Sequence, residues 1–370
     1  MLDSFVAHNF RQFTNLSIPK LAQVNLFVGR NNVGKSALLE ALQIYLSQAS
    51  GDVLADILIG RAENWDSIVR SNDAPSMGDS IRHLFRGHQL PSIGEKGIIV
   101  GPSEIHRQLQ LTIAAYQSIL NSDSGTRQLL LLDVDQTNFF GDSTSDSIPY
   151  LVAVENNRTR RLGAIHSTIR RLQIQPATTG EVVNLRLVPT KGLPPRTVAA
   201  WWDAINLTDL EEEVVAGLRV INDMITGIAF VEGSSSRASR IPLVRVQGQA
   251  ERLPLSSMGD GVTRLLYITL ALVNAKDGVL LIDEFENGLH WSVQEKVWQT
   301  VFQLASRLNV QVFATTHSRD CVQSFEAAWR QHPTKGVYYR LESDPIGEVR
   351  ARSYSLETLS DSIETDTETR

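Results

Sequence analysis

The chain has 370 residues, of which 42% are hydrophobic and 21% charged, and its formal net charge at pH 7 is −6. This composition supports a sizeable core and argues against wholesale disorder, and the length allows one large domain or two. The acidic balance excludes a uniformly basic protein that wraps nucleic acid, although a local basic patch stays compatible with it.

The expected compartment is the cytoplasm. The single cysteine, Cys321, excludes an internal disulfide and fits a reducing environment. The first residues lack the basic-then-apolar order of a signal peptide, and no run of about 18 apolar residues occurs. We therefore expect no membrane-spanning helix and no membrane partner.

The N-terminal region predicts strands that lead into a glycine-rich turn. Residues 5–10 and 16–18 indicate two strands around a turn, and residues 24–28 indicate a short buried strand. Residues 29–36 read G-x-x-x-x-G-K-S, and residues 37–46 are strong helix formers with apolar side chains at helical spacing. Strand, glycine turn and helix together are the context that a phosphate-binding P-loop requires.

The chemistry of this turn suits a nucleoside triphosphate with its metal. Backbone N–H groups in the turn and at the helix N-terminus point at a polyanion. Lys35 would bring a positive charge to the β- and γ-phosphates, and the Ser36 hydroxyl would bind Mg²⁺. Gly34 leaves room for the phosphate, and Asn32 is a residue that tolerates a positive φ. We expect ATP to contact Gly29, Asn31, Asn32, Val33, Gly34, Lys35, Ser36 and Ala37.

A region rich in predicted strands follows, at residues 97–100, 108–114 and 127–133. Beyond it, residues 182–188 form another predicted strand, and residues 197–225 are largely helical. We divide the chain into an N-terminal lobe with the P-loop and a β-rich subdomain (1–190), a helical insertion (191–228), a C-terminal lobe (229–345) and a C-terminal tail (346–370).

A cluster of arginines lies between residues 156 and 172. Its members would suit a DNA backbone, which is one interpretation. The alternative is a solvated face that bonds neighbouring carboxylates, and the scarcity of stacking aromatics nearby weakens the interpretation as a single-strand site. The arginines are Arg158, Arg160, Arg161, Arg170 and Arg171.

Two further buried strands end in residues suited to phosphate chemistry. Residues 278–284 are an apolar run that ends in Asp283 and Glu284, and residues 310–318 end with His317 and Ser318. Ligand chemistry in α/β sheets takes place at the carboxyl ends of strands. Asp283 would hold Mg²⁺, Glu284 would polarise an attacking water, and His317 would donate to the γ-phosphate.

A second candidate anion site precedes a long predicted helix. Residues 255–261 read L-S-S-M-G-D-G, and the helix runs from 262 to 275. A helix N-terminus of this kind binds anions. Because the P-loop already serves one side of a triphosphate, this turn makes sense if it closes over a nucleotide held by another subunit. The alternative interpretation is a simple capped helix.

These motifs occur in an order that resembles the ABC-type ATPase heads of the SMC, RecF and OLD (overcoming lysogenization defect) families. The order is P-loop, long insertion, signature turn, Asp-Glu strand and switch histidine, and the resemblance covers most of the chain. It is strongest to OLD-like ATPases, through the phrases at 258–261 and 314–321. The resemblance implies an α/β P-loop NTPase fold with an antiparallel β subdomain and a helical insertion.

The resemblance also implies roles for individual residues and an activity. The activity is ATP hydrolysis by a homodimer that forms on ATP binding and encloses two ATP molecules. Asp260 departs from the usual Glu or Gln of the signature, and residues 286–290 match the loop that contacts the other subunit. The residues implied to contact nucleotide are Arg11 in the opening strand, Ser257, Gly259 and Asp260 in the signature turn, and His317 as the switch.

Two departures from the family shape the expected output. Only 53 residues follow His317, too few for the Toprim nuclease domain of OLD nucleases, and residues 37–254 lack the sustained heptads of an SMC coiled coil. We therefore expect a nuclease or other effector on a separate chain, in DNA repair or anti-phage defence. The alternative is a nucleotide-gated scaffold with incidental hydrolysis, and a transporter ATPase subunit fits less well. The Mg²⁺-sensing glutamine of such heads has three candidates, Gln89, Gln117 and Gln136.

Overall fold

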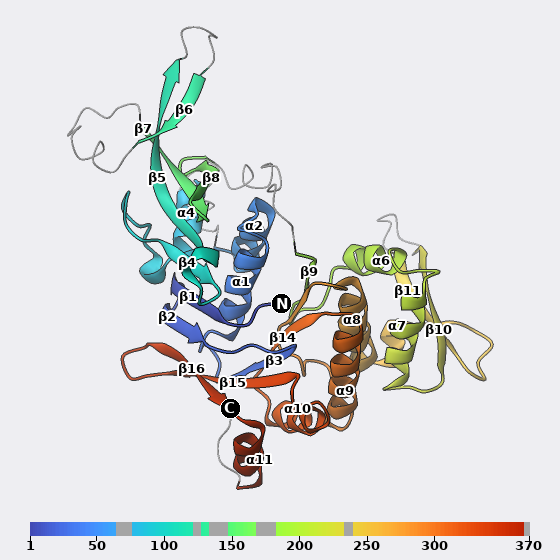
Figure 1. Ribbon diagram of the computed structural model, residues 1–370. Coiled ribbons are helices and arrows are strands. Elements are labelled where there is room, and N and C mark those ends of the chain that lie inside the picture. The colour runs from blue at the N-terminus through green and yellow to red at the C-terminus, as the bar shows by residue number, and fades with distance from the viewer. Residues whose placement is uncertain (64–75, 121–126, 133–146, 168–182, 233–239, 366–370) are drawn as a thin grey trace.

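A six-stranded sheet lies at the centre of the computed structural model, which describes residues 1–63, 76–120, 127–132, 147–167, 183–232 and 240–365 (Figure 1). Its strand order is β16-β15-β3-β14-β13-β9, and every neighbouring pair is parallel except β15 with β16. The strands are β3 (Val24–Val28), β9 (Leu185–Val188), β13 (Val279–Ile282), β14 (Gln311–Thr316), β15 (Gly336–Ser343) and β16 (Val349–Tyr354).

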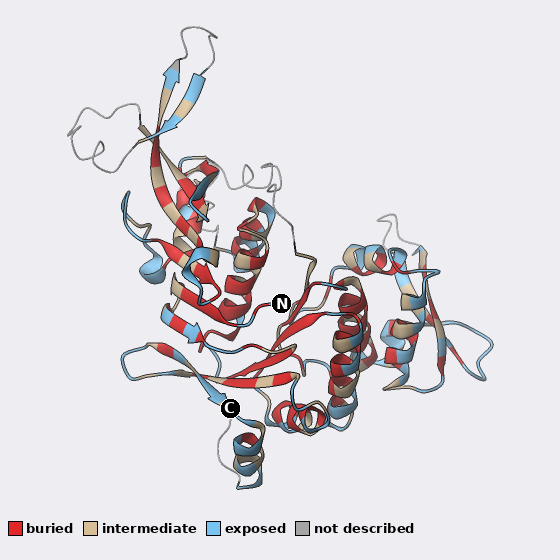
Figure 2. Ribbon diagram, in the orientation of Figure 1, coloured by how far each residue is buried: buried red, intermediate tan, exposed pale blue. Residues whose placement is uncertain are grey.

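The strands β3, β13 and β14 in the middle of this sheet are buried along their whole length, as strands covered on both faces are, and they therefore read as largely apolar runs. Leu26 of β3 faces a core shared with the helices α8 (Asp260–Asn274), α9 (Trp291–Arg307) and α10 (Arg319–Gln331). Phe27 points the other way, toward α1 (Lys35–Leu46), and stacks on aromatic side chains of β14 and β15. Figure 2 shows the resulting band of buried residues through the central sheet and its helices.

An antiparallel sheet packs beyond α1 and forms the β subdomain expected from the sequence. Its order is β2-β1-β4-β5-β7-β8, with β6 paired to β5. In Figure 1 the β5–β6–β7 end of this sheet extends away from the body of the molecule. The strands are β1 (Phe5–Phe10), β2 (Phe13–Ile18), β4 (Ile98–Gly101), β5 (Leu109–Leu120), β6 (Arg127–Leu131), β7 (Ser147–Glu155) and β8 (Arg158–Ala164).

Helices and a small sheet separate β9 from α8. The helices α6 (Pro195–Asp203) and α7 (Asp209–Arg219) are followed by the sheet of β10 (Ile225–Glu232), β11 (Arg240–Val246) and β12 (Leu253–Pro254). Trp202 stacks on Phe230 and joins the two. A short 3₁₀ turn, η5 (Leu255–Met258), then leads from β12 into α8.

Short helices complete the described part of the chain. The region that we separated as a tail contains β16 and α11 (Leu356–Glu364), and α11 packs against α10. The other elements are α2 (Gly51–Gly60), α4 (Met77–Ile81), η1 (Arg82–Leu84), η2 (Arg86–His88) and η3 (Ile105–Arg107). Among the described residues, no helix has both the length and the apolar character needed to cross a membrane. The α/β P-loop fold with an antiparallel subdomain is thus confirmed.

Candidate functional site

The glycine-rich turn joins β3 to α1, and its backbone needs residues that tolerate positive φ. Gly34 has a φ of 109°, and a Cβ there would lie 2.6 Å from the Gln12 amide nitrogen and 2.7 Å from the Phe13 ring. Asn32 has a φ of 63°, which agrees with its expected left-handed conformation. The turn therefore packs against the β1–β2 connection. Its backbone N–H groups lie at the N-terminus of α1, as anion binding requires.

Lys35 is held inside this turn. Its side chain is 7% exposed, and Nζ donates to the carbonyl oxygens of Gly29 at 2.7 Å and Arg30 at 3.0 Å. Burial lowers the pKa of Lys35, although the carboxylates of Glu284, Glu286 and Asp283 act to raise it. The Lys35 ammonium thus lies where phosphates would bind.

Asp283 is the meeting point of four strands or helices. It accepts hydrogen bonds from the hydroxyl of Ser36 on α1 at 3.1 and 3.3 Å, from Thr315 on β14 at 2.7 Å, and from Thr190 after β9 at 3.1 Å. Because β13 pairs with both β14 and β9, the residue after Ile282 lies next to the ends of both neighbours. The sequence indicated Ser36 and Asp283 as ligands of the same magnesium ion, and the two threonines are additions.

Glu284 and His317 also come together at this edge. His317 Nδ1 lies 3.6 Å from Glu284 Oε1 and 3.3 Å from Glu286 Oε1, and the His317 amide donates to Glu286 Oε1 at 3.1 Å. Glu284 adopts a left-handed backbone with a φ of 49°. Glu286 therefore orients the histidine, while Glu284 is directed toward the cleft.

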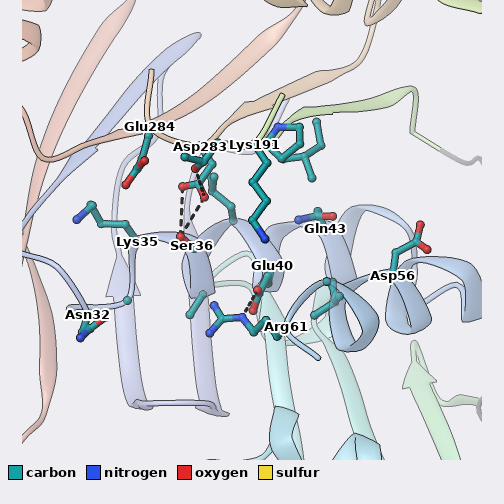
Figure 3. Close-up of a pocket in the computed structure, with 18 of the residues that line it drawn as sticks. Asn32, Lys35, Ser36, Glu40, Gln43, Asp56, Arg61, Lys191, Asp283 and Glu284 are labelled. Atoms are coloured by element: carbon teal, nitrogen blue, oxygen red, sulfur yellow. Dashed lines mark hydrogen bonds and ion pairs between the residues drawn. The ribbon is translucent and has the colours of Figure 1, made fainter. Parts of the chain in front are cut away.

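The P-loop, the start of α1 and the segments that follow β9 and β13 border a cleft of about 910 Å³ (Figure 3). Figure 3 shows the Ser36 hydroxyl joined to the Asp283 carboxylate, with the side chains of Lys35 and Glu284 beside this pair. The predicted site residues that line the cleft are Asn31, Asn32, Gly34, Lys35, Ser36, Ala37, Asp283 and Glu284. The volume is in the range of small-molecule sites.

The other predicted residues occupy different positions. Gly29 and Val33 belong to the turn but do not line the cleft, and His317 lies next to it through Glu284. Among the described lining residues, none belongs to the signature turn. Ser257, Gly259 and Asp260 are exposed at the start of α8.

Arg11 is the buried member of an ion-pair cluster beside the cleft. It is 8% exposed, its guanidinium contacts both carboxylate oxygens of Glu63 at 2.6 and 3.1 Å, and Nε lies 2.5 Å from Glu40 Oε2. Arg61 reaches the other oxygen of Glu40 at 2.6 Å. Burial raises the pKa of Glu40, and the two arginines oppose this shift. Glu40 and Arg61 line the cleft, whereas Arg11 is absent from its described lining.

The arginine cluster is less available than the sequence indicated. Arg160 donates to the backbone carbonyl of Gln48, and Arg161 lies over the rings of Tyr116 and Tyr150. Arg158 is exposed at the start of β8. Arg170 and Arg171 lie outside the described residues. Arg160 and Arg161 are thus engaged within the chain, through a carbonyl and two aromatic rings rather than through the carboxylates that the second interpretation expected.

Several cleft residues could not be recognised in the sequence. Gln43 and Lys191 line the cleft, and Gln12 borders it from the β1–β2 connection. Of the glutamines considered as metal sensors, Gln89 and Gln117 are absent from the described lining, and Gln136 lies outside the described residues. Lys191 could have been found from its place three residues after the predicted strand at 182–188. The sequence did not show which strands pair with that strand, so the position of its end in the sheet was unknown.

The donor set at Asp283 fits Mg²⁺. A hydroxyl and a carboxylate are the oxygen ligands that this ion prefers, and it usually keeps waters and phosphate oxygens as its other ligands. The part of the chain that the structure describes holds no group of three or more His, Cys, Asp or Glu side chains suited to a metal. A magnesium ion held by Ser36 and Asp283 would thus depend on the nucleotide for its remaining ligands.

The glycine turn, the Ser36–Asp283 pair and the Glu284–His317 pair at the edge of a parallel sheet define a P-loop ATPase of the ABC type. Residues 24–320 match the family model described as "AAA domain, putative AbiEii toxin, Type IV TA system", and the chain belongs to this family. The match covers every element of the site from β3 to His317.

Three known proteins show how far the similarity extends. An "ATP/GTP phosphatase" of Helicobacter pylori is 24% identical over 356 residues, which cover 90% of this chain and 91% of the relative. The structure of an SMC head bound to the C-terminal winged-helix domain of ScpA has a TM-score of 0.49 at 12% identity, covering 97% of this chain and 99% of that one. The SMC head domain from Thermotoga maritima has a TM-score of 0.45 at 13% identity, covering 96% and 99%.

Proposed function

We propose that this chain hydrolyses ATP as a homodimer in which two copies enclose two nucleotides. The observation that carries the proposal is the contact between Ser36 and Asp283, which joins the P-loop helix to the end of β13 across 247 positions of sequence. Phosphoryl transfer needs a phosphate cradle and a metal-binding pair at one place. The name of the Helicobacter pylori relative, "ATP/GTP phosphatase", supports hydrolysis and makes GTP a second substrate to test.

The proposal of a dimer rests on the exposed surface formed by the signature turn and the loop at residues 286–290. The signature turn is exposed at the N-terminus of α8 and serves no phosphate in its own cleft. Gly288 packs against Asp260, so the loop at 286–290 and the turn share one surface. Trp291 is 63% exposed next to this loop, which favours a surface that another protein covers. A second copy would present its nucleotide to this surface.

Each residue then has a defined task. Lys35 binds the β- and γ-phosphates, and Ser36 and Asp283 would hold Mg²⁺, which neutralises phosphate charge when bound. Glu284 accepts a proton as water attacks the γ-phosphorus, and the bond to the bridging oxygen breaks to leave ADP and phosphate. His317 donates to a γ-phosphate oxygen as negative charge develops there.

The proposed output is a switch that acts on a separate nuclease or effector in DNA repair or anti-phage defence. The resemblance to SMC, RecF and OLD heads supports this role by analogy. The alternative is a nucleotide-gated scaffold, for which hydrolysis is incidental. Turnover measured with and without DNA separates the two, because a switch is stimulated and a scaffold keeps a slow, constant rate.

The test of the dimer uses Glu284→Gln, which keeps the shape of the side chain and removes its ability to accept a proton. Light scattering with saturating ATP and Mg²⁺ should show a stable dimer for this variant. A phosphate-release assay should show that its ATP turnover is slow. Glu295→Gln is the matched control, since Glu295 is exposed on α9 and contacts only Gln299 among the hydrogen bonds of its side chain. A monomeric Glu284→Gln variant under these conditions contradicts the proposal.

A further inference from the structure

Arg264 is a buried cation in the apolar face of α8. Arg264 is 4% exposed, and the next residues, Leu265 and Leu266, are fully buried. Burial lowers the pKa of Arg264 to about 10, against the opposing effect of Asp283, Glu286 and Glu284. The side chain therefore stays charged at neutral pH. A charge in such a place is costly unless its hydrogen bonds are well made.

Three backbone carbonyls accept from this guanidinium. Nη1 donates to Pro189 at 2.9 Å, and Nη2 donates to Asp283 at 2.7 Å and to Glu284 at 2.8 Å. These carbonyls lie beyond the last residues of β9 and β13, where the sheet no longer supplies partners. Arg264 thus joins the ends of two strands to the signature helix.

The two contacts on β13 fix the backbone on both sides of one residue. The carbonyl of Asp283 belongs to the peptide before the Glu284 Cα, and the carbonyl of Glu284 belongs to the peptide after it. Glu284 has a φ of 49°, a conformation that costs on the order of 1–3 kcal/mol for a residue with a side chain and persists only where its surroundings hold it. Arg264 thus holds the peptides on both sides of Glu284, in addition to the Thr315 hydroxyl that accepts from the Glu284 amide.

The same helix begins at the signature turn. Asp260 is its first residue, and four residues at 1.5 Å each place Arg264 about 6 Å along the axis. A Cβ on Gly261 would lie 3.1 Å from the carbonyl oxygen of Gly288, so the start of α8 packs tightly on the loop after β13. The start of α8, Arg264 and the strand ends that it holds therefore form one connected set of contacts.

We propose that Arg264 is a positioning residue that couples the signature turn of a subunit to the Glu284 carboxylate of the same subunit. A nucleotide that a second copy seats on the turn shifts α8, and Arg264 transmits this shift to the backbone of Glu284. Each active site thereby responds to occupancy of the other. This inference rests on the proposed homodimeric ATPase.

The first experiment compares Arg264→Met, Arg264→Lys and the control Arg186→Met. Arg186 is a partly buried arginine on β9 that also donates to a carbonyl, but at the other end of the strand. Arg264→Met should lower kcat about 100-fold, because a misplacement of about 1 Å costs that much, while the affinity for a fluorescent ATP analogue stays within about twofold. The Hill coefficient for ATP should fall to about 1.

Arg264→Lys keeps a buried cation and serves if the methionine variant does not fold. It should retain the thermal melting temperature of the wild type and still lose cooperativity, since one ammonium cannot reproduce the fork of a guanidinium. Wild-type kcat and cooperativity in this variant would overturn the inference. If the wild type itself stays monomeric with ATP, the proposed homodimer is wrong. That result is distinct from a dimeric wild type whose cooperativity is unchanged by Arg264→Lys, which contradicts the role of Arg264 alone.

Mixed dimers test whether the coupling acts within one subunit. A subunit with Arg264→Met is combined with one that carries Glu284→Gln and a distinct tag, and the mixed species is purified. Coupling within a subunit predicts that the mixed dimer is inactive. The Glu284→Gln subunit lacks the carboxylate, and the Arg264→Met subunit has a Glu284 carboxylate that is misplaced. Recovery of about half of the wild-type turnover would place the action of Arg264 across the interface and overturn the proposal.

Discussion

The Thr315 hydroxyl lies 2.7 Å from Oδ1 of Asp283, and it accepts a hydrogen bond from the Glu284 amide at 2.9 Å. Thr315 is fully buried on β14, whose register pairs Ala314 with Ile282 of β13. One side chain on the neighbouring strand therefore orients the carboxylate that would hold the metal and the backbone of the residue that would activate water. This relationship leads to the first prediction.

Thr315→Val keeps the shape of the side chain and removes both hydrogen bonds. The Glu284 amide then loses its acceptor, and we expect the free energy of unfolding to fall by about 1–3 kcal/mol. Asp283 loses an orienting donor, so the Mg²⁺ concentration for half-maximal turnover should rise. Chemical denaturation and a magnesium titration measure the two effects. Thr269→Val is the control, because Thr269 is equally buried on α8 but donates within its own helix. An unchanged magnesium requirement in Thr315→Val would contradict the prediction.

The residues of the site were recognisable in the sequence where the chemistry is local. The P-loop is one continuous motif, and Asp283, Glu284 and His317 each follow a buried strand, so their meeting at one edge followed from the rule for parallel strands. The confirmed fold class rests on the same reasoning. The pairing of β9 with β13 is a long-range contact that no local pattern records, and Thr190 and Lys191 were missed for that reason.

Arg264 shows a second limit of sequence reasoning. An arginine in the first turns of a helix is normally read as exposed, and only its flanking apolar residues at helical spacing hinted at burial. Arg11 shows the reverse case. The resemblance indicated a nucleotide contact, whereas the structure places its guanidinium between Glu40 and Glu63. Neither carboxylate partner is near Arg11 in sequence, so the ion pairs could not be anticipated.

Nucleotide affinity should weaken at alkaline pH earlier than for an ordinary lysine site. The charged form of Lys35 binds phosphate, and burial lowers the pKa of Lys35 from 10.5. As the pH rises through this lowered pKa, the ammonium loses its proton and binding weakens, so the loss begins below pH 10.5. Binding of a fluorescent ATP analogue between about pH 7 and pH 10.5 measures it. Lys35→Arg should move the loss to higher pH, and an identical profile in that variant would assign the titration to another group.

Gly34→Ala should disable the turn without touching a charged group. The φ of 109° disfavours any residue with a Cβ, and the added carbon would lie 2.6 Å from the Gln12 side chain. We expect a loss of about 1–3 kcal/mol in stability and a large loss of nucleotide affinity, because the N–H groups of the turn are displaced. Thermal melting and equilibrium binding test this. The control is Gly87→Ala, at a φ of 71° with nothing within 4 Å of its Cβ, which should lower stability but leave nucleotide affinity unchanged.

Arg11→Met should destabilise the fold, and more so as the pH rises. The substitution leaves the partly buried Glu40 and Glu63 with less compensation, and breaking a buried ion pair costs roughly 3–5 kcal/mol, which is the upper limit for this pair. Burial already raises the pKa of Glu40, and the loss of Arg11 raises it further. The stabilising contribution of a group with a raised pKa is complete below its unfolded value near 4.5 and is lost as the pH increases through the folded value, so the deficit should be larger at pH 8 than at pH 5.

Chemical denaturation at both pH values measures this deficit, and Arg61→Met is the matched control. Arg61 also contacts Glu40, but its side chain is 38% exposed, so solvent screens the pair and its loss should cost no more than about 1 kcal/mol. Affinity for the ATP analogue, measured well below the melting temperature, separates the two roles of Arg11. A purely structural Arg11 leaves the affinity of folded protein unchanged, whereas a guanidinium that turns from Glu63 to phosphate makes the affinity fall together with the stability.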